Sequence, residues 1–235
     1  MEACADLGQR RAELAFVHEE MTRQVIFGDS VLLYQQHARD TLEPQALERQ
    51  LDEARVARPD LWQVWVACLR QRVERQRYDE ARALCDEAIG RFPLLPRMHV
   101  EKADIARLAG DREAERNALR EALRLSPAWG LPARKLADSI EADGDFAASR
   151  LLIEAALRHS PGDALLHGYL GHALWQLGER DRALASLERA ADLDPGYDWA
   201  WRALGERGTQ AGRPDAAITL ARRLAGCRPG ELRAW

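Results

Sequence analysis

The stretch ALLHGYLGHALWQLGERDRALASLERAADLDPGY, residues 164–197, contains two apolar stripes with the spacing of a helix. The first stripe consists of Leu166, Leu170, Ala173, Leu174 and Leu177, and the second of Leu184, Leu187, Ala190, Ala191 and Leu193. Gly178 separates the stripes, where a helix would end and the chain would turn. Pro195 cannot continue the second helix, because proline lacks a backbone N–H. The stretch therefore predicts a helix, a short turn, a second helix and a second turn.

The same pattern recurs along the 235-residue chain with a period of 34 residues. Six of the ten prolines follow this period: Pro59, Pro93, Pro127, Pro161, Pro195 and Pro229. Seventeen residues before them stand Leu42, Gln76, Gly110, Gly144, Gly178 and Gly212. Twenty-four residues before the last four stand Ala103, Ala137, Gly171 and Gly205, and these small residues predict close contacts between helices. Few residues of a unit favour strands, so the repeat predicts an all-α fold.

The period divides the chain into six units, at residues 28–61, 62–95, 96–129, 130–163, 164–197 and 198–231. One helix pair cannot bury its apolar face alone, so each unit must stack on its neighbours. We expect residues 1–27 to form a capping helix, with an apolar face made of Leu7, Leu14, Val17, Met21 and Val25. Residues 232–235 restart the pattern, because Trp235 is in register with Trp201 and Trp65. We therefore expect a seventh unit that is truncated.

A 34-residue unit of helix, turn and helix resembles the tetratricopeptide repeat (TPR). Residues 164–197 are most similar to it, with the pair Leu170-Gly171 and with Gly178, Ala183, Ala190 and Pro195 at the places that the family uses. Residues 198–231 add Trp201 and the pair Leu204-Gly205, whereas residues 28–61 are degenerate. The resemblance covers residues 28–231. It implies a TPR-like α-solenoid, a right-handed superhelix of antiparallel helix pairs.

Composition argues against several classes of protein. Apolar residues make up 46% of the chain and charged residues 31%, which excludes a disordered chain. The net charge of -4 does not suit a general nucleic-acid binder, which needs a basic surface. No stretch contains about 20 mostly apolar residues, so we expect no membrane insertion. The 34 basic residues include only two lysines, a bias typical of a GC-rich, bacterial genome.

Residues 1–14, MEACADLGQRRAEL, lack the apolar core of a secretory signal, and the four cysteines show no CxxC or framework spacing. Both observations predict a cytoplasmic protein. No P-loop, GxGxxG, HExxH or GxSxG motif occurs, so we expect neither a catalytic site nor a cofactor. We expect no metal site either, because His167 and His172 would diverge on a helix. We interpret Cys68 and Cys85 as small buried hydrophobic residues rather than a redox pair.

In the TPR family the first helix of each unit lines a concave groove, and the resemblance places two groups of side chains there. A basic stripe would consist of Arg70, Arg97, Arg107, Arg134 and Lys135. An aromatic patch would consist of Tyr169, His172, Trp175 and Trp199, flanked by Arg134 and Arg202. Aromatic and arginine side chains are common anchors of protein interfaces. Two alternatives stay open: the basic residues could pair with Asp104, Asp138 and Glu141, and the tryptophans could pack between helices.

Some TPR domains grip the C-terminal carboxylate of chaperones with Lys or Arg and Asn side chains. Arg134 could serve as one such basic residue, but the expected Asn positions hold Asp138 and Tyr169. Because an aspartate would repel a carboxylate, the sequence argues against this clamp.

The resemblance implies a non-catalytic scaffold that binds a protein or peptide partner in its groove. Arginines beside an aromatic patch favour a peptide with an apolar residue next to an acidic one. Two other functions stay open. One is a substrate- or partner-recruiting arm of an enzyme whose catalytic domain lies beyond residue 235. The other is a self-association module whose ends stack into a homo-oligomer.

Overall fold

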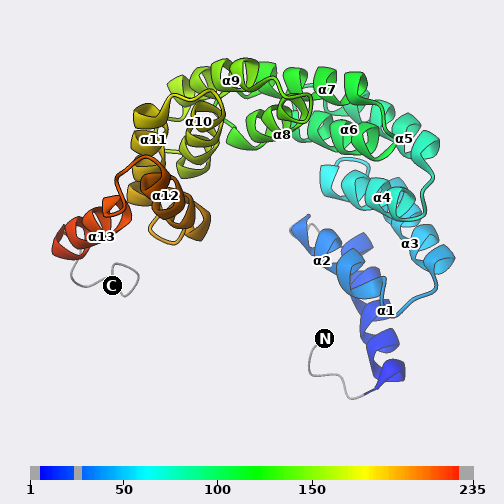
Figure 1. The fold of residues 1–235 in the computed structure, drawn as a ribbon. Coiled ribbons are helices and arrows are strands. Elements are labelled where there is room, and N and C mark those ends of the chain that lie inside the picture. The colour runs from blue at the N-terminus through cyan, green and yellow to red at the C-terminus, as the bar shows by residue number, and fades with distance from the viewer. Residues whose placement is uncertain (1–5, 24–27, 228–235) are drawn as a thin grey trace. The chain divides into compact units, whose positions relative to one another are not determined.

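The computed structural model describes residues 6–23 and 28–227, which form thirteen α-helices and no strand (Figure 1). The predicted all-α fold is therefore confirmed for this part of the chain. The helices belong to two compact units, residues 1–118 and 119–235. None of the helices in the described residues is both long enough and apolar enough to cross a membrane.

The first unit contains six complete helices and the start of a seventh. They are α1 (Leu7–Arg23), α2 (Asp29–Ala38), α3 (Pro44–Ala57), α4 (Trp62–Glu74), α5 (Tyr78–Arg91), α6 (Pro96–Leu108) and α7 (Arg112–Leu125). Large side chains from several helices meet in one core, among them Leu14, Leu47, Leu51, Leu69 and Met98. Each pair thus buries its apolar stripes against its neighbours, as stacked repeats must.

The predicted capping helix is present as α1, but its apolar face is narrower than expected. Leu14 is buried in the core and Val17 packs against it, whereas Leu7 is 55% exposed. The side chains of Met21 and Val25 lie outside the described residues. So do residues 1–5, 24–27 and 228–235, including the restart of the pattern at Trp235.

The second unit continues with antiparallel helix pairs. Its helices are α8 (Gly130–Glu141), α9 (Phe146–His159), α10 (Ala164–Gln176), α11 (Arg180–Leu193), α12 (Asp198–Gln210) and α13 (Ala216–Cys227). The pair predicted for residues 164–197 is confirmed, because α10 ends just before Gly178 and α11 ends just before Pro195. The two apolar stripes supply buried Leu166, Leu174, Leu184 and Leu187.

The turn inside each pair requires a left-handed backbone. Gly110, Gly144, Gly178 and Gly212 have φ angles between 75° and 80°. Only glycine adopts this conformation without a steric cost. Gln76 occupies the equivalent place one period earlier and has a φ of 57°, so the turn persists there without glycine. Leu42 is not left-handed, which agrees with the degenerate sequence of residues 28–61.

The carbonyl groups of the periodic prolines accept hydrogen bonds from the next helix. The indole Nε1 of Trp65 donates to the Pro59 carbonyl at 3.0 Å, and Trp201 donates to Pro195 at 3.1 Å. His167 Nε2 lies 3.0 Å from the Pro161 carbonyl in the same register. These side chains therefore pack at the turn between units.

The small residues 24 positions before the periodic prolines were expected at close contacts between helices. This prediction is confirmed for Gly171 and wrong for Gly205. A Cβ atom on Gly171 would lie 2.8 Å from Leu187 Cγ, whereas a Cβ on Gly205 would meet nothing within 4 Å. The close approach in the last described pair is instead at Gly208, where a Cβ would lie 2.7 Å from the Arg213 carbonyl oxygen.

The interpretation of Cys68 and Cys85 as small buried residues is confirmed. Both are fully buried free thiols. Cys68 Sγ donates to the Leu51 carbonyl, and Cys85 Sγ lies 3.5 Å from the Met98 carbonyl. Burial raises the pKa of both thiols to about 12, so neither forms the thiolate that redox chemistry needs.

Candidate functional site

All ten residues predicted for the groove lie on the first helices of their pairs. Arg70 is on α4; Arg97 and Arg107 are on α6; Arg134 and Lys135 are on α8; Tyr169, His172 and Trp175 are on α10; Trp199 and Arg202 are on α12. The predicted basic stripe is divided between the two units, because its first three members belong to the first unit and the last two to the second. Each unit contains a cavity on these helices.

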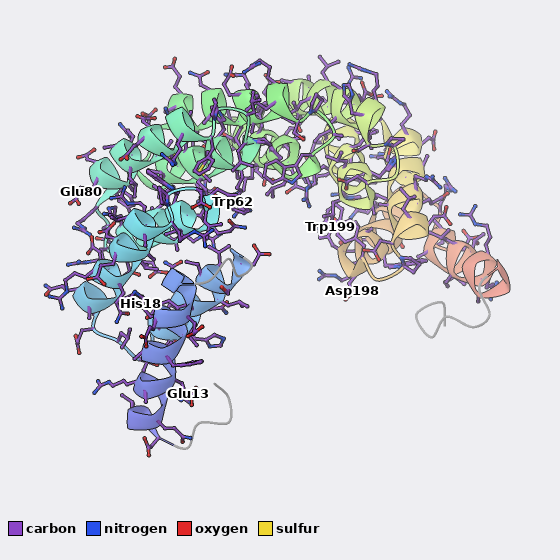
Figure 2. All side chains as sticks on the ribbon, turned by 180° about the vertical axis from the view of Figure 1, so that it is seen from behind. Glu13, His18, Trp62, Glu80, Asp198 and Trp199 are labelled. Carbon is purple, nitrogen blue, oxygen red and sulfur yellow. The ribbon has the colours of Figure 1, made fainter. Side chains whose placement is uncertain are left out.

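The larger of the two cavities lies in the second unit and has a volume of about 310 Å³. Asp138, Glu141, Tyr169, His172, Tyr197 and Trp199 line it. These residues come from α8, α10, α12 and the turn that precedes α12. Trp199 lies in the first turn of α12, as Figure 2 shows. The structure therefore brings together three of the four residues of the predicted aromatic patch, with two carboxylates beside them.

The two carboxylates have different surroundings. Asp138 is exposed, and the hydroxyl of Tyr169 donates to its Oδ2 at 3.1 Å. The Glu141 side chain is only 12% exposed, and Ser149 Oγ donates to its Oε1 at 2.6 Å. Burial raises the pKa of Glu141 above its ordinary range; the Ser149 hydrogen bond opposes this shift and the Asp138 charge adds to it.

His172 is held as a neutral ring. Arg207 Nη2 lies 2.9 Å from His172 Nδ1. Because a guanidinium group only donates, Nδ1 accepts and the ring proton sits on Nε2, which is 3.6 Å from Glu141 Oε2. Burial and the charge of Arg207 lower the pKa of His172. The imidazole therefore adds no positive charge to the cavity at neutral pH.

Arg207 links the aromatic side chains of the site. Its guanidinium carbon lies 5.6 Å from the ring centroids of both Trp175 and Trp199. Its Nη1 also donates to the Gly171 carbonyl at 3.3 Å. Trp175 does not line the cavity, and its second cationic neighbour is Arg180, at 5.8 Å. Trp175 is thus half-buried, with the guanidinium groups of Arg180 and Arg207 near its ring.

The walls of the cavity depend on the absence of a side chain at Gly168. A Cβ atom there would lie 2.8 Å from Tyr197 Cε1 and 3.3 Å from Trp199 Cζ3. Glycine lets both rings lie against α10, where they stack on each other with centroids 5.8 Å apart. The ring of His172 meets Trp199 edge-on at 6.5 Å.

The two arginines expected to flank the aromatic patch are not among the residues that line this cavity. Burial raises the pKa of Tyr169 and of Tyr197, and the nearby charge of Arg134 opposes both shifts. Arg134 Nε points to the Gly130 carbonyl at 3.4 Å, and Arg202 is exposed. The guanidinium that reaches the aromatic rings belongs to Arg207, because it finds acceptors on α10 at Gly171 and His172. Sequence reasoning missed this arginine.

The cavity of the first unit has a volume of about 220 Å³ and a different lining. Arg70, Arg97 and Arg107 contribute to it, together with the acidic side chains of Glu101 and Asp104. Arg97 Nη2 lies 2.7 Å from Glu101 Oε1, and Arg70 Nη2 lies 3.6 Å from the same oxygen. Arg70 and Arg97 therefore pair with Glu101, an acid that the pairing alternative did not name. Arg107 is exposed.

Among the described side chains, no group of three or more His, Cys, Asp or Glu residues is placed to hold a metal ion. His167 and His172 bond to different partners, the Pro161 carbonyl and Arg207.

Comparisons with known proteins identify the repeat. The Tetratricopeptide repeat family matches residues 70–128, 134–198 and 170–231, which together make up more than half of the chain. A comparison with curated protein sequences found no match. The solved structures support the all-α TPR solenoid fold predicted from the sequence.

Three solved structures represent the similarity. "MamA 41-end from Desulfovibrio magneticus RS-1" shares 15% identity, with 73% of this chain and 97% of that chain covered and a TM-score of 0.53. "Crystal structure of APC/C hetero-tetramer Cut9-Hcn1" shares 16%, with 97% and 46% covered and a TM-score of 0.57. "Crystal structure of YrrB: a TPR protein with an unusual peptide-binding site" shares 14%, with 78% and 95% covered and a TM-score of 0.51.

Proposed function

We propose that this chain, which belongs to the tetratricopeptide repeat family, is a non-catalytic scaffold that binds a peptide segment of a partner protein on the first helices of its pairs. The observation that carries the proposal is the cavity lined by α8, α10 and α12. Three successive helix pairs contribute to one hollow, as an extended segment lying across the pairs requires. YrrB, whose fold is similar, is a TPR protein with an unusual peptide-binding site.

The chemistry of the cavity supports the same function. Its volume of about 310 Å³ lies at the lower end of the range for ligand pockets. Tyr169, Tyr197 and Trp199 are half-buried. Each presents an apolar ring and a polar tip, which is the combination that dominates binding energy at protein interfaces.

The first-unit arginines contribute less to this function. Arg70 and Arg97 share Glu101, whose side chain is 9% exposed, so binding an acidic partner there would require breaking an existing ion pair. We therefore expect Arg97→Ala to change partner binding much less than a change in the aromatic cavity.

Partner capture with matched variants tests the proposal. Trp199→Ala should weaken binding by about 2 kcal/mol if Trp199 is an anchor. Leu151→Ala is the control, because Leu151 is a 59% exposed apolar residue on α9, a second helix. Circular dichroism on each variant separates loss of binding from loss of fold. Equal capture by wild type, Trp199→Ala and Leu151→Ala would place the binding surface elsewhere.

A further inference from the structure

The cavity between α8, α10 and α12 combines aromatic walls with negative charge. Tyr169, His172, Tyr197 and Trp199 supply rings, Asp138 and Glu141 supply carboxylates, and none of the lining residues is a lysine or an arginine. His172 is neutral because its Nδ1 accepts from Arg207. The charged lining residues are therefore acidic, and they lie next to Arg207, which contacts His172 and Trp199, and near Arg134, whose charge acts on Tyr169 and Tyr197.

The aromatic rings add a second attraction for cations. The face of an aromatic ring carries partial negative charge, and a cation within about 6 Å of its centroid is stabilised. Trp199 already shows this geometry with the chain's own Arg207, at 5.6 Å. Tyr197 stacks on Trp199, and both rings line the cavity together with Tyr169 and the carboxylate of Asp138.

We propose that this cavity binds the guanidinium group of an arginine in the partner peptide. The inference rests on the proposed function and assigns the anchor residue of the ligand. A guanidinium is planar, stacks on aromatic rings and sheds water more easily than an ammonium group. Its N–H groups form a fork that matches carboxylate oxygens. The site therefore prefers arginine to lysine and rejects an acidic anchor.

Glu141 strengthens the argument through its burial. Its carboxyl is nearly enclosed, and one oxygen accepts from Ser149 while the other lies near His172. A buried carboxylate without a cationic partner is costly. An arginine in the cavity would supply that partner. Asp138 lies at the exposed part of the lining, where its charge can also attract the ligand before contact.

The test uses the whole chain and four blocked tripeptides, acetyl-Ala-X-Ala-amide, in which X is arginine, citrulline, lysine or glutamate. Citrulline keeps the shape of arginine but lacks its charge. Binding is followed by NMR through the indole Nε1–H signal of Trp199, which Trp199→Phe identifies. We expect the arginine peptide to bind most tightly and the citrulline peptide at least about tenfold more weakly, which corresponds to about 1.4 kcal/mol. The glutamate peptide should not bind.

Variants locate the binding. Asp138→Asn should weaken binding of the arginine peptide several-fold, and Gly168→Ala should weaken it by displacing Tyr197 and Trp199. Asp181→Asn is the control, because it makes the same change of charge at an exposed position on α11. Added salt should weaken binding to wild type and affect the Asp138→Asn variant less.

The outcomes separate this proposal from the proposed function. If wild type binds the arginine and citrulline peptides equally well, the guanidinium assignment is overturned, and no variant is needed to show it. Tighter binding of the glutamate peptide would overturn it too. In either case the scaffold function stands if Trp199→Ala still weakens partner capture. If Trp199→Ala leaves partner capture unchanged, the binding surface for the partner lies elsewhere, and the peptide series alone then decides whether the cavity binds a guanidinium group.

Discussion

Replacing Gly171 with alanine should destabilise the protein, whereas the same change at Gly205 should stabilise it. The two glycines are 34 residues apart and lie inside α10 and α12, with no left-handed backbone at either. Alanine is favoured over glycine inside a helix by about 0.5–1 kcal/mol. The two positions therefore differ only in the space around the added methyl group.

The available space determines the sign at each position. A Cβ on Gly205 meets nothing within 4 Å, so the full gain of about 0.5–1 kcal/mol should appear. A Cβ on Gly171 would lie 2.8 Å from Leu187 Cγ and 3.1 Å from the Ala183 carbonyl oxygen. One is the branch point of a fully buried side chain and the other is backbone, so neither moves freely. Overpacking costs about 1–3 kcal/mol, which leaves a net loss of up to about 2.5 kcal/mol.

Urea unfolding of wild type and both variants, followed by circular dichroism and tryptophan fluorescence, measures these changes. Leu187→Val should restore part of the stability of Gly171→Ala, although Leu187→Val alone creates a cavity and costs stability. The recovered part is a coupling energy between two residues in contact. A shift of the same sign in Gly171→Ala and Gly205→Ala would refute the packing described for α10 and α11.

Three other changes test the fold and the site. Gln76→Gly should raise the free energy of unfolding by about 0.5–1 kcal/mol, because glutamine is strained at a φ of 57°; a lower urea midpoint would contradict this. Trp201→Phe should cost about 0.5–1.5 kcal/mol through loss of the hydrogen bond to Pro195, and unchanged stability would show that water replaces the indole. Glu141→Gln should stabilise the protein at neutral pH and not in acid. Burial raises the pKa of Glu141 in the folded state, so wild type loses stability as the pH rises from the ordinary pKa of a glutamate through the raised pKa. A difference between Glu141→Gln and wild type that does not vary with pH would contradict this assignment.

The helix boundaries could be predicted from the sequence because their causes are local. Gly178 and Pro195 end helices through their own backbone geometry, wherever the rest of the chain lies. Gln76 is the exception, because it adopts a φ of 57° without being glycine, so the residue type alone does not predict its left-handed turn.

The candidate site could be predicted only in part, because its remaining residues are set by tertiary contacts. Tyr197 lies in the turn before α12, outside the helical positions that the family resemblance assigns to the groove. Arg207 was missed because its role depends on acceptors supplied by α10. Gly168 was the available signal, since a glycine inside an apolar helix indicates that something approaches it closely.

The internal repeat itself distinguishes residues that serve the fold from residues that serve the site. Positions that the fold needs change little from unit to unit, as the six prolines spaced by 34 residues show. The position of Glu141 is different, because the equivalent residues are Arg39, Val73, Arg107, Trp175 and Thr209. A helix pair therefore stacks with an apolar, cationic, aromatic or polar residue there, so packing does not require the carboxylate. The Glu141 side chain is nevertheless nearly enclosed, and burying an ionisable group lowers the stability of the folded state. The arginine ligand that we propose would account for a buried carboxylate that the repeat does not need.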